Sequence, residues 1–214
     1  MLHRKPVIRL EQSVSPIRLE EPTGYSPVSI SVSMNGELIR LLVKESAVAE
    51  IRATEQGTGA RFPRTTTEGE YSGIVLTHSQ WGVCQIFLKS LNATFPTTQL
   101  LPNNEILVVS PRCKRRTDGT HDLNARVYDS DGKLKHELLL GDGIEKVQTD
   151  PLGNIWVAYF DEGVFGNFGW STPVGSSGLC CFDGKGTRLW EFDPPSGFTD
   201  IVDCYALNVA KDGV

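Results

Sequence analysis

Short runs of β-branched and aromatic residues, bounded by glycine, proline, asparagine and aspartate, recur along the whole chain. The window closest to a helical apolar period, residues 38–48, also fits a strand followed by a turn. Glycine (21 residues) and proline (12) are frequent enough to supply many turns. Thirteen runs predict strands, at 28–32, 37–43, 49–53, 73–77, 83–88, 105–109, 125–128, 133–139, 144–149, 154–160, 178–182, 188–192 and 201–209. We therefore expect an all-β protein.

The second half of the chain repeats itself. The segment YDSDG at 128–132, followed by Glu137-Leu138, aligns with FDGKG at 182–186, followed by Glu191-Phe192. In both copies an aromatic-Asp-x-x-Gly turn joins two expected strands. The segment DPLGNI at 150–155 is echoed by LPNNEI at 101–106 and by KDGV at 211–214. Repeats of roughly 40 to 60 residues with four strands each are typical of propeller blades.

One stretch of the repeat resembles a known family. It reads Gly143-Ile144-x-x-Val147-x-x-Asp150-x-x-Gly153-Asn154-Ile155-Trp156-Val157, followed by Gly178-Leu179-x-x-Phe182-Asp183. This pattern is similar to the repeat of two-component-regulator and related NHL-type propellers, and the resemblance covers residues 95–209. It implies a β-propeller of four-stranded antiparallel blades.

The organisation expected from the repeat is a single propeller domain. We expect a poorly structured N-terminal segment at 1–25, divergent β-blades at 26–94, and two repeated blades with the start of a third at 95–214. The third blade would begin with the strand at 201–209, and the chain stops just after the next turn glycine. We therefore expect the propeller to be incomplete in this chain.

Composition and charge restrict the partners. The formal net charge of -5 provides no general attraction for nucleic acid, and no run of 18 apolar residues is present to cross a bilayer. The five cysteines are odd in number and contain no CxxC motif, so we expect neither a metal site nor a cofactor. The charged first residues lack the apolar core of a secretory signal, which predicts a cytoplasmic protein. The expected partner is a protein or a small-molecule ligand.

Two connections between expected strands are longer than a turn requires, and equivalent loops of adjacent blades leave on the same face. The loop at 161–177 carries two carboxylates and aromatic rings able to stack on a ligand, and its candidate residues are Asp161, Glu162, Phe168 and Trp170. The alternative is that these aromatic rings only cap the core.

The loop at 111–122 carries basic groups suited to phosphate or carboxylate recognition, and its candidate residues are Arg115, Arg116 and His121. The alternative is a solvated run of charge. We expect the two loops to meet and to form one ligand site.

These features leave three functions open. The first is a non-catalytic propeller that binds a ligand or a protein through its long loops. The second is a metal-dependent hydrolase similar to sugar lactonases, for which Asp193, Asp200 and Asp203 supply candidate oxygen ligands, although their sequence context also fits turns and strand edges. The third is the sensor module of a signalling protein. No catalytic residue is assigned by the sequence.

Overall fold

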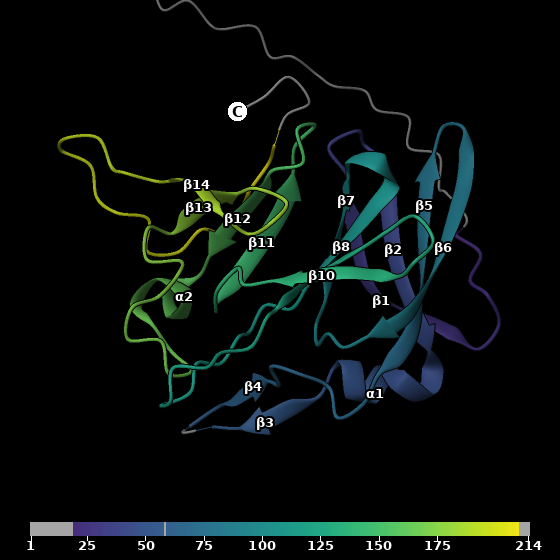
Figure 1. Cartoon of the computed structure of the whole chain (residues 1–214), viewed down its shortest axis with the longest axis horizontal. Helices are drawn as coiled ribbons and strands as arrows, with labels where there is room; N and C mark the ends of the chain where they lie inside the picture. Colours follow the sequence, from purple (N-terminus) through teal and green to yellow (C-terminus); the bar gives the residue numbers. More distant parts are fainter. Residues whose placement is uncertain (1–18, 58, 210–214) are drawn as a thin grey trace, which may run out of the picture.

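Three four-stranded antiparallel sheets, formed one after another along the chain, make up most of the structure (Figure 1). The computed structural model describes residues 19–57 and 59–209. The strand orders are β1-β2-β5-β6, β10-β9-β8-β7 and β11-β12-β13-β14, and β3 pairs with β4 in a separate hairpin. The all-β prediction is therefore confirmed.

Turns and loops separate the strands and helices, which have the following bounds. The first sheet contains β1 (Tyr25–Val32), β2 (Leu38–Lys44), β5 (Tyr71–Ser79) and β6 (Gly82–Leu91). The second contains β7 (Thr97–Leu101), β8 (Glu105–Val109), β9 (Ala125–Tyr128) and β10 (Leu134–Leu138). The third contains β11 (Ile144–Thr149), β12 (Ile155–Tyr159), β13 (Leu179–Phe182) and β14 (Arg188–Glu191). The remaining elements are β3 (Thr54–Gln56), β4 (Arg61–Pro63), η1 (Glu45–Ala47), α1 (Val48–Ile51), η2 (Pro102–Asn104) and α2 (Asp161–Phe165).

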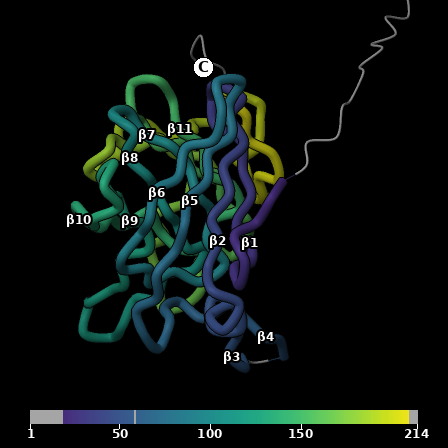
Figure 2. Tube along the Cα trace, turned by 90° about the vertical axis from the view of Figure 1, so that its right-hand side faces the viewer, coloured from purple at the N-terminus to yellow at the C-terminus, as the bar shows by residue number. Residues whose placement is uncertain are grey.

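The first sheet has apolar side chains on both faces. Leu41 pairs with Val75, which pairs with Ile86, and these side chains share one face. Leu42 pairs with Ile74 on the opposite face. The face of Leu41 forms a buried cluster with Ile106, Val108 and Tyr128 of the second sheet. Figure 2 shows the four strands of this sheet side by side.

The second and third sheets share a similar core. Leu107 and Val127 of the second sheet are buried with Ile155 and Val157 of the third. Their first strands, β7 and β11, contact each other, and β7 also contacts β1. The hydroxyl of Thr149 donates to the carbonyl oxygen of Leu100 at 2.6 Å, which links β11 to β7 directly. The three sheets therefore stack face to face with their first strands together.

The two ends of the stacked sheets differ. Short turns join β1 to β2, β5 to β6, β7 to β8, β9 to β10, β11 to β12 and β13 to β14, and we call this the turn end. The connections at 45–70, 110–124 and 160–178 are long, and we call their side the loop end. In Figure 1 the loop end lies towards the bottom of the view, with β3, β4 and α1.

Two predicted strands are absent from the described residues, and three observed strands were not predicted. Residues 49–53 do not form a strand, because α1 (Val48–Ile51) places Ile51 on the same side as the buried Ala47, four residues earlier. Residues 201–209 form no strand. The sequence also did not predict β3, β4 and β7 (Thr97–Leu101). In β7, an edge strand of the second sheet, Thr and Gln residues obscure the strand pattern.

Parts of the sequence expectations lie outside the described residues. These are the first 18 residues of the N-terminal segment and the repeat echo at 211–214. Within the described part, no helix is both long enough and apolar enough to cross a membrane.

The repeated turn allows a matched test of the contact between sheets. Gly132 and Gly186 occupy the same turn position with left-handed φ angles of 73° and 84°. A Cβ on Gly132 would lie 2.0 Å from the carbonyl oxygen of Phe87 in the first sheet, whereas one on Gly186 would lie 3.4 Å from Leu138. We expect Gly186→Ala to cost about 1–2 kcal/mol of unfolding free energy from backbone strain alone. Gly132→Ala should cost about 1–3 kcal/mol more. Equal losses in urea denaturation would contradict this prediction.

Candidate functional site

The long connections of the second and third sheets meet around the guanidinium group of Arg112, which is 3% exposed. Its Nε and Nη2 atoms donate to the two carboxylate oxygens of Asp142 at 3.0 and 2.9 Å. Its Nη1 atom donates to Glu162, in α2. Two-point pairing of this kind holds the planar guanidinium in one orientation. Arg112 therefore ties the connection after β8 to the connections after β10 and β12.

Aromatic rings complete the environment of Arg112. Its Cζ atom lies 4.3 Å from the ring centre of Phe168, 5.3 Å from that of Phe160 and 5.7 Å from that of Phe62. The rings of Phe62 and Phe168 also make an edge contact at 5.7 Å. Because Phe62 belongs to β4, in the connection between β2 and β5, the long connection of the first sheet joins the same cluster. We call Arg112, Asp142, Glu162, Phe62 and Phe168 the arginine cluster.

The Asp142 carboxylate is held in place by the backbone as well as by Arg112. The amide nitrogen of Cys113 donates to its Oδ1 atom at 2.8 Å. Burial raises the pKa of Asp142 to about 6, against the opposing effect of the Arg112 charge. The sequence did not single out Arg112 or Asp142. Arg112 lies in the basic loop at 111–122 and Asp142 in another connection, and only the fold brings them together.

The structure brings the two predicted loops together. The amide nitrogen of Arg115 donates to the carbonyl oxygen of Phe168 at 2.9 Å. The Arg115 guanidinium lies 5.6 Å from the ring centre of Trp170, and the ring of His121 lies 5.9 Å from the same residue. Arg116 instead pairs with Asp122 of its own loop at 2.6 Å.

The remaining predicted residues are largely engaged within the protein. Trp170 is 7% exposed, and its Nε1 atom donates to the carbonyl oxygen of Cys113 at 2.7 Å. Phe168 and Glu162 belong to the arginine cluster, whereas Asp161 is exposed at the start of α2. The contacts made by these loops are thus mainly with one another. Ligand binding by the seven residues remains a prediction.

The cysteine and acidic side chains show no reactive arrangement in the part of the chain that the structure describes. Burial raises the pKa of Cys181 to about 11 and also raises the pKa values of Cys113, Cys180 and Cys204. These four thiols are protonated at neutral pH, whereas a nucleophilic cysteine needs the thiolate. Among residues 19–57 and 59–209, no group of three or more His, Cys, Asp or Glu side chains is arranged to hold a metal ion.

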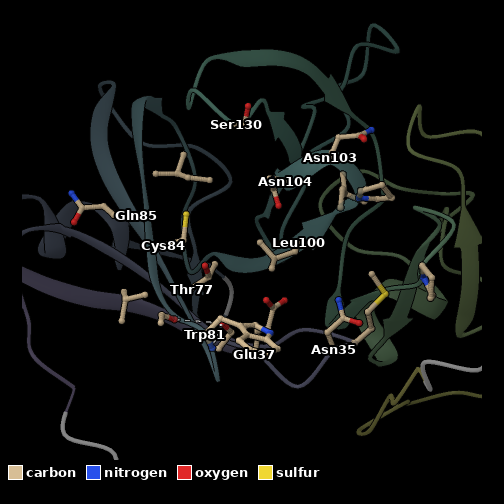
Figure 3. Close-up of a pocket in the computed structure, with 18 residues that line it drawn as sticks. Asn35, Glu37, Thr77, Trp81, Cys84, Gln85, Leu100, Asn103, Asn104 and Ser130 are labelled. Carbon is tan, nitrogen blue, oxygen red and sulfur yellow. Dashed lines mark hydrogen bonds between the residues drawn. The ribbon is translucent and has the colours of Figure 1, made fainter.

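A cleft of about 850 Å³ lies at the turn end, between the first and second sheets. Figure 3 shows Cys84 and Gln85 of β6 on one side and Asn103 and Asn104 of η2 across the open space from them. The indole of Trp81, from the turn between β5 and β6, lies at its edge and is 88% exposed. None of the seven residues predicted from the sequence lines this cleft.

The sequence predicts turns at the positions of these cleft residues, but it does not predict that the turns lie around one cleft. Asn103 and Asn104 were recognised only as part of a repeated turn, and Trp81 was assigned no role. Both asparagines have left-handed φ angles, of 62° and 58°. Residues other than glycine rarely adopt this left-handed conformation, but asparagine tolerates it better than most.

No family model matches the chain, and no curated protein matches its sequence. Among solved structures, a protein of unknown function from Bacteroides caccae is similar, with a TM-score of 0.36 and 12% sequence identity. The similarity covers 84% of this chain and 71% of that chain.

Removing Arg112 tests how strongly the buried carboxylate of Asp142 destabilises the fold without its partner. We expect Arg112→Met to lower the free energy of unfolding by about 3–5 kcal/mol, because Asp142 is left buried without its partner. The double variant Arg112→Met/Asp142→Leu should recover part of this loss. The control Lys146→Met breaks a surface pair with Glu145 and should change stability little. Urea denaturation measures all three, and equal effects of Arg112→Met and Lys146→Met would contradict the prediction.

The raised pKa of Asp142 predicts a specific dependence of stability on pH. The carboxyl group has a pKa of about 6 in the folded protein and an ordinary value of 3.8, so the folded state binds the proton more tightly. Its contribution to stability is fully present below about pH 4 and is lost as the pH rises through about 6. Relative to Asp142→Asn, the wild type should lose about 3 kcal/mol over this window. A constant difference between the two proteins would contradict the assignment.

Proposed function

We propose that the protein is a non-catalytic binding scaffold of the propeller type, which holds a ligand in the cleft between its first and second sheets. The propeller part of the proposal is supported by three four-stranded antiparallel sheets in chain order. It is also supported by the contacts of β7 with β1 and β11, which bring the first strands together. The repeat resembling NHL-type propellers agrees with this arrangement.

The outer faces of the stack add support. Ile30 and Phe87 on the first sheet are 62% and 44% exposed, and Trp190 on the third sheet is 44% exposed. Apolar residues on the outward face are what a blade between two neighbours carries, because each repeat is covered by the next. The first and third sheets thus resemble members of a longer stack.

The cleft between the first and second sheets is the main support for a binding function. Its volume of about 850 Å³ lies within the range of small-molecule sites, which is about 300–1,000 Å³. It combines apolar side chains such as Leu100 and Trp81 with amide and hydroxyl groups such as those of Asn104 and Ser130. A concave site with a few convergent polar groups binds and orients a ligand without requiring a reactive residue.

The sequence also raised a metal-dependent hydrolase similar to sugar lactonases. That activity needs several ligands around a metal ion, and the described residues contain no such group. The raised pKa values of Cys113 and Cys181 likewise give no support for nucleophilic catalysis. Nothing observed favours a sensor module over the binding scaffold.

A cleft-blocking variant tests the proposal. Ser130 lines the cleft, whereas Asp131 is exposed in the same turn and does not line it. The probes are neutral saccharides, amino acids, nucleosides and dicarboxylic acids, measured by thermal shift. We expect at least one class to raise the thermal midpoint of the wild type and of Asp131→Trp, by about 5 °C at a hundredfold excess over Kd.

Ser130→Trp should abolish this response because the indole fills the cleft. An equal shift of the thermal midpoint in Ser130→Trp and Asp131→Trp would show that the ligand binds outside the cleft. If no class of probe shifts the wild type, the binding function proposed for the cleft is wrong.

A further inference from the structure

The side chains that line the cleft are of a restricted chemical kind. Among the described residues that line it, Glu37 is the one with a charge, and no lysine, arginine or histidine is present. An anionic ligand such as a phosphate would enter without a cation to pair with it, which is unfavourable. The polar lining is mainly neutral, and includes Asn35, Thr77, Gln85, Asn103, Asn104 and Ser130.

Amide and hydroxyl side chains suit a particular class of ligand. An amide offers two donors and a carbonyl acceptor, and a hydroxyl group both donates and accepts. Ligand hydroxyl groups have the same dual character, so they can pair with these side chains in either direction. Asn103 and Asn104 follow each other in the left-handed backbone conformation, which asparagine tolerates in turns. The turn places both residues in the lining of the cleft.

Trp81 supplies the apolar part of the recognition. It is 88% exposed, so the face of its ring is accessible to a ligand in the cleft. The backbone nitrogen of Trp81 donates a hydrogen bond to the hydroxyl of Ser79 at 3.1 Å, which fixes the turn that carries the indole. The face of an indole is electron-rich and attracts the weakly positive C–H groups on the apolar face of a sugar ring.

We propose that the cleft binds a neutral saccharide, with its ring stacked on Trp81 and its hydroxyl groups paired with the amides of Asn103 and Asn104. This proposal rests on the binding function proposed above and names the class of ligand. A saccharide is a compact molecule with an apolar face and a rim of hydroxyl groups. It therefore matches both an exposed indole and a neutral polar lining.

Titration calorimetry with neutral mono- and disaccharides tests the stacking. We expect Trp81→Ala to raise Kd at least tenfold and Trp81→Phe to raise it less, because a smaller ring keeps part of the contact. Glu37→Gln should change Kd less than threefold, since a neutral ligand does not need the carboxylate. The matched control is Trp190→Ala, which removes an exposed indole that does not line the cleft. It should leave Kd unchanged.

Two results would overturn the saccharide proposal. One is binding of saccharides with the same Kd to the wild type and to Trp81→Ala, with unchanged thermal midpoints showing that the variant is folded. The other is a large loss of saccharide affinity in Glu37→Gln together with no loss in Trp81→Ala, which would show that the carboxylate and not the indole holds the sugar. Because both sites are at or near the surface, neither substitution removes a core side chain.

A reporter inside the cleft separates failure of the ligand class from failure of the binding function. Cys84 is an exposed thiol that lines the cleft, whereas Cys113, Cys180 and Cys181 are buried. A fluorescent maleimide on Cys84 in a Cys204→Ser background would therefore report on occupancy. A response to amino acids or nucleosides but not to saccharides would refute the saccharide class and retain the scaffold. No response to any probe would refute both.

Discussion

Each four-stranded sheet of this protein has apolar side chains that must be removed from water, and the neighbouring sheet covers those on the inner face. Leu41 and Leu42 are neighbours in β2 and point to opposite faces. Leu41 packs against the second sheet, whereas Leu42 is buried with Ile74 and Leu76 of its own sheet. Stacking is therefore required by the strands themselves, and the contact of β7 with both β1 and β11 follows from it.

Stacking leaves two ends with different properties. At the loop end the connections cannot be covered by sheet faces, and they are held by the arginine cluster. The pairing of Arg112 with Asp142 and Glu162 satisfies charges that would otherwise be buried alone. At the turn end short turns diverge around the cleft, where Trp81 and Asn104 stay accessible.

The loop residues selected from the sequence illustrate why chemistry in a loop is difficult to interpret. Charge and aromaticity marked Arg116 and Trp170 as candidates for binding. In the structure Arg116 pairs with Asp122, and Trp170 donates to a backbone carbonyl. These side chains satisfy polar groups of the protein, as long loops must when they are partly buried. Arg112, which pairs with Asp142 and Glu162, lies in the same basic loop but was not selected.

The local pattern of residues was sufficient to predict most of the strands, because runs of β-branched residues between turn residues have few alternative conformations. It also identified the repeated turn that contains Gly132 and Gly186, whose left-handed angles favour glycine. It failed at β7, because a polar strand is stabilised by its neighbours and not by its own residues. The cleft and the arginine cluster were decided by the tertiary structure alone. Both join residues from different sheets, and only the packing of those sheets sets the distances between them.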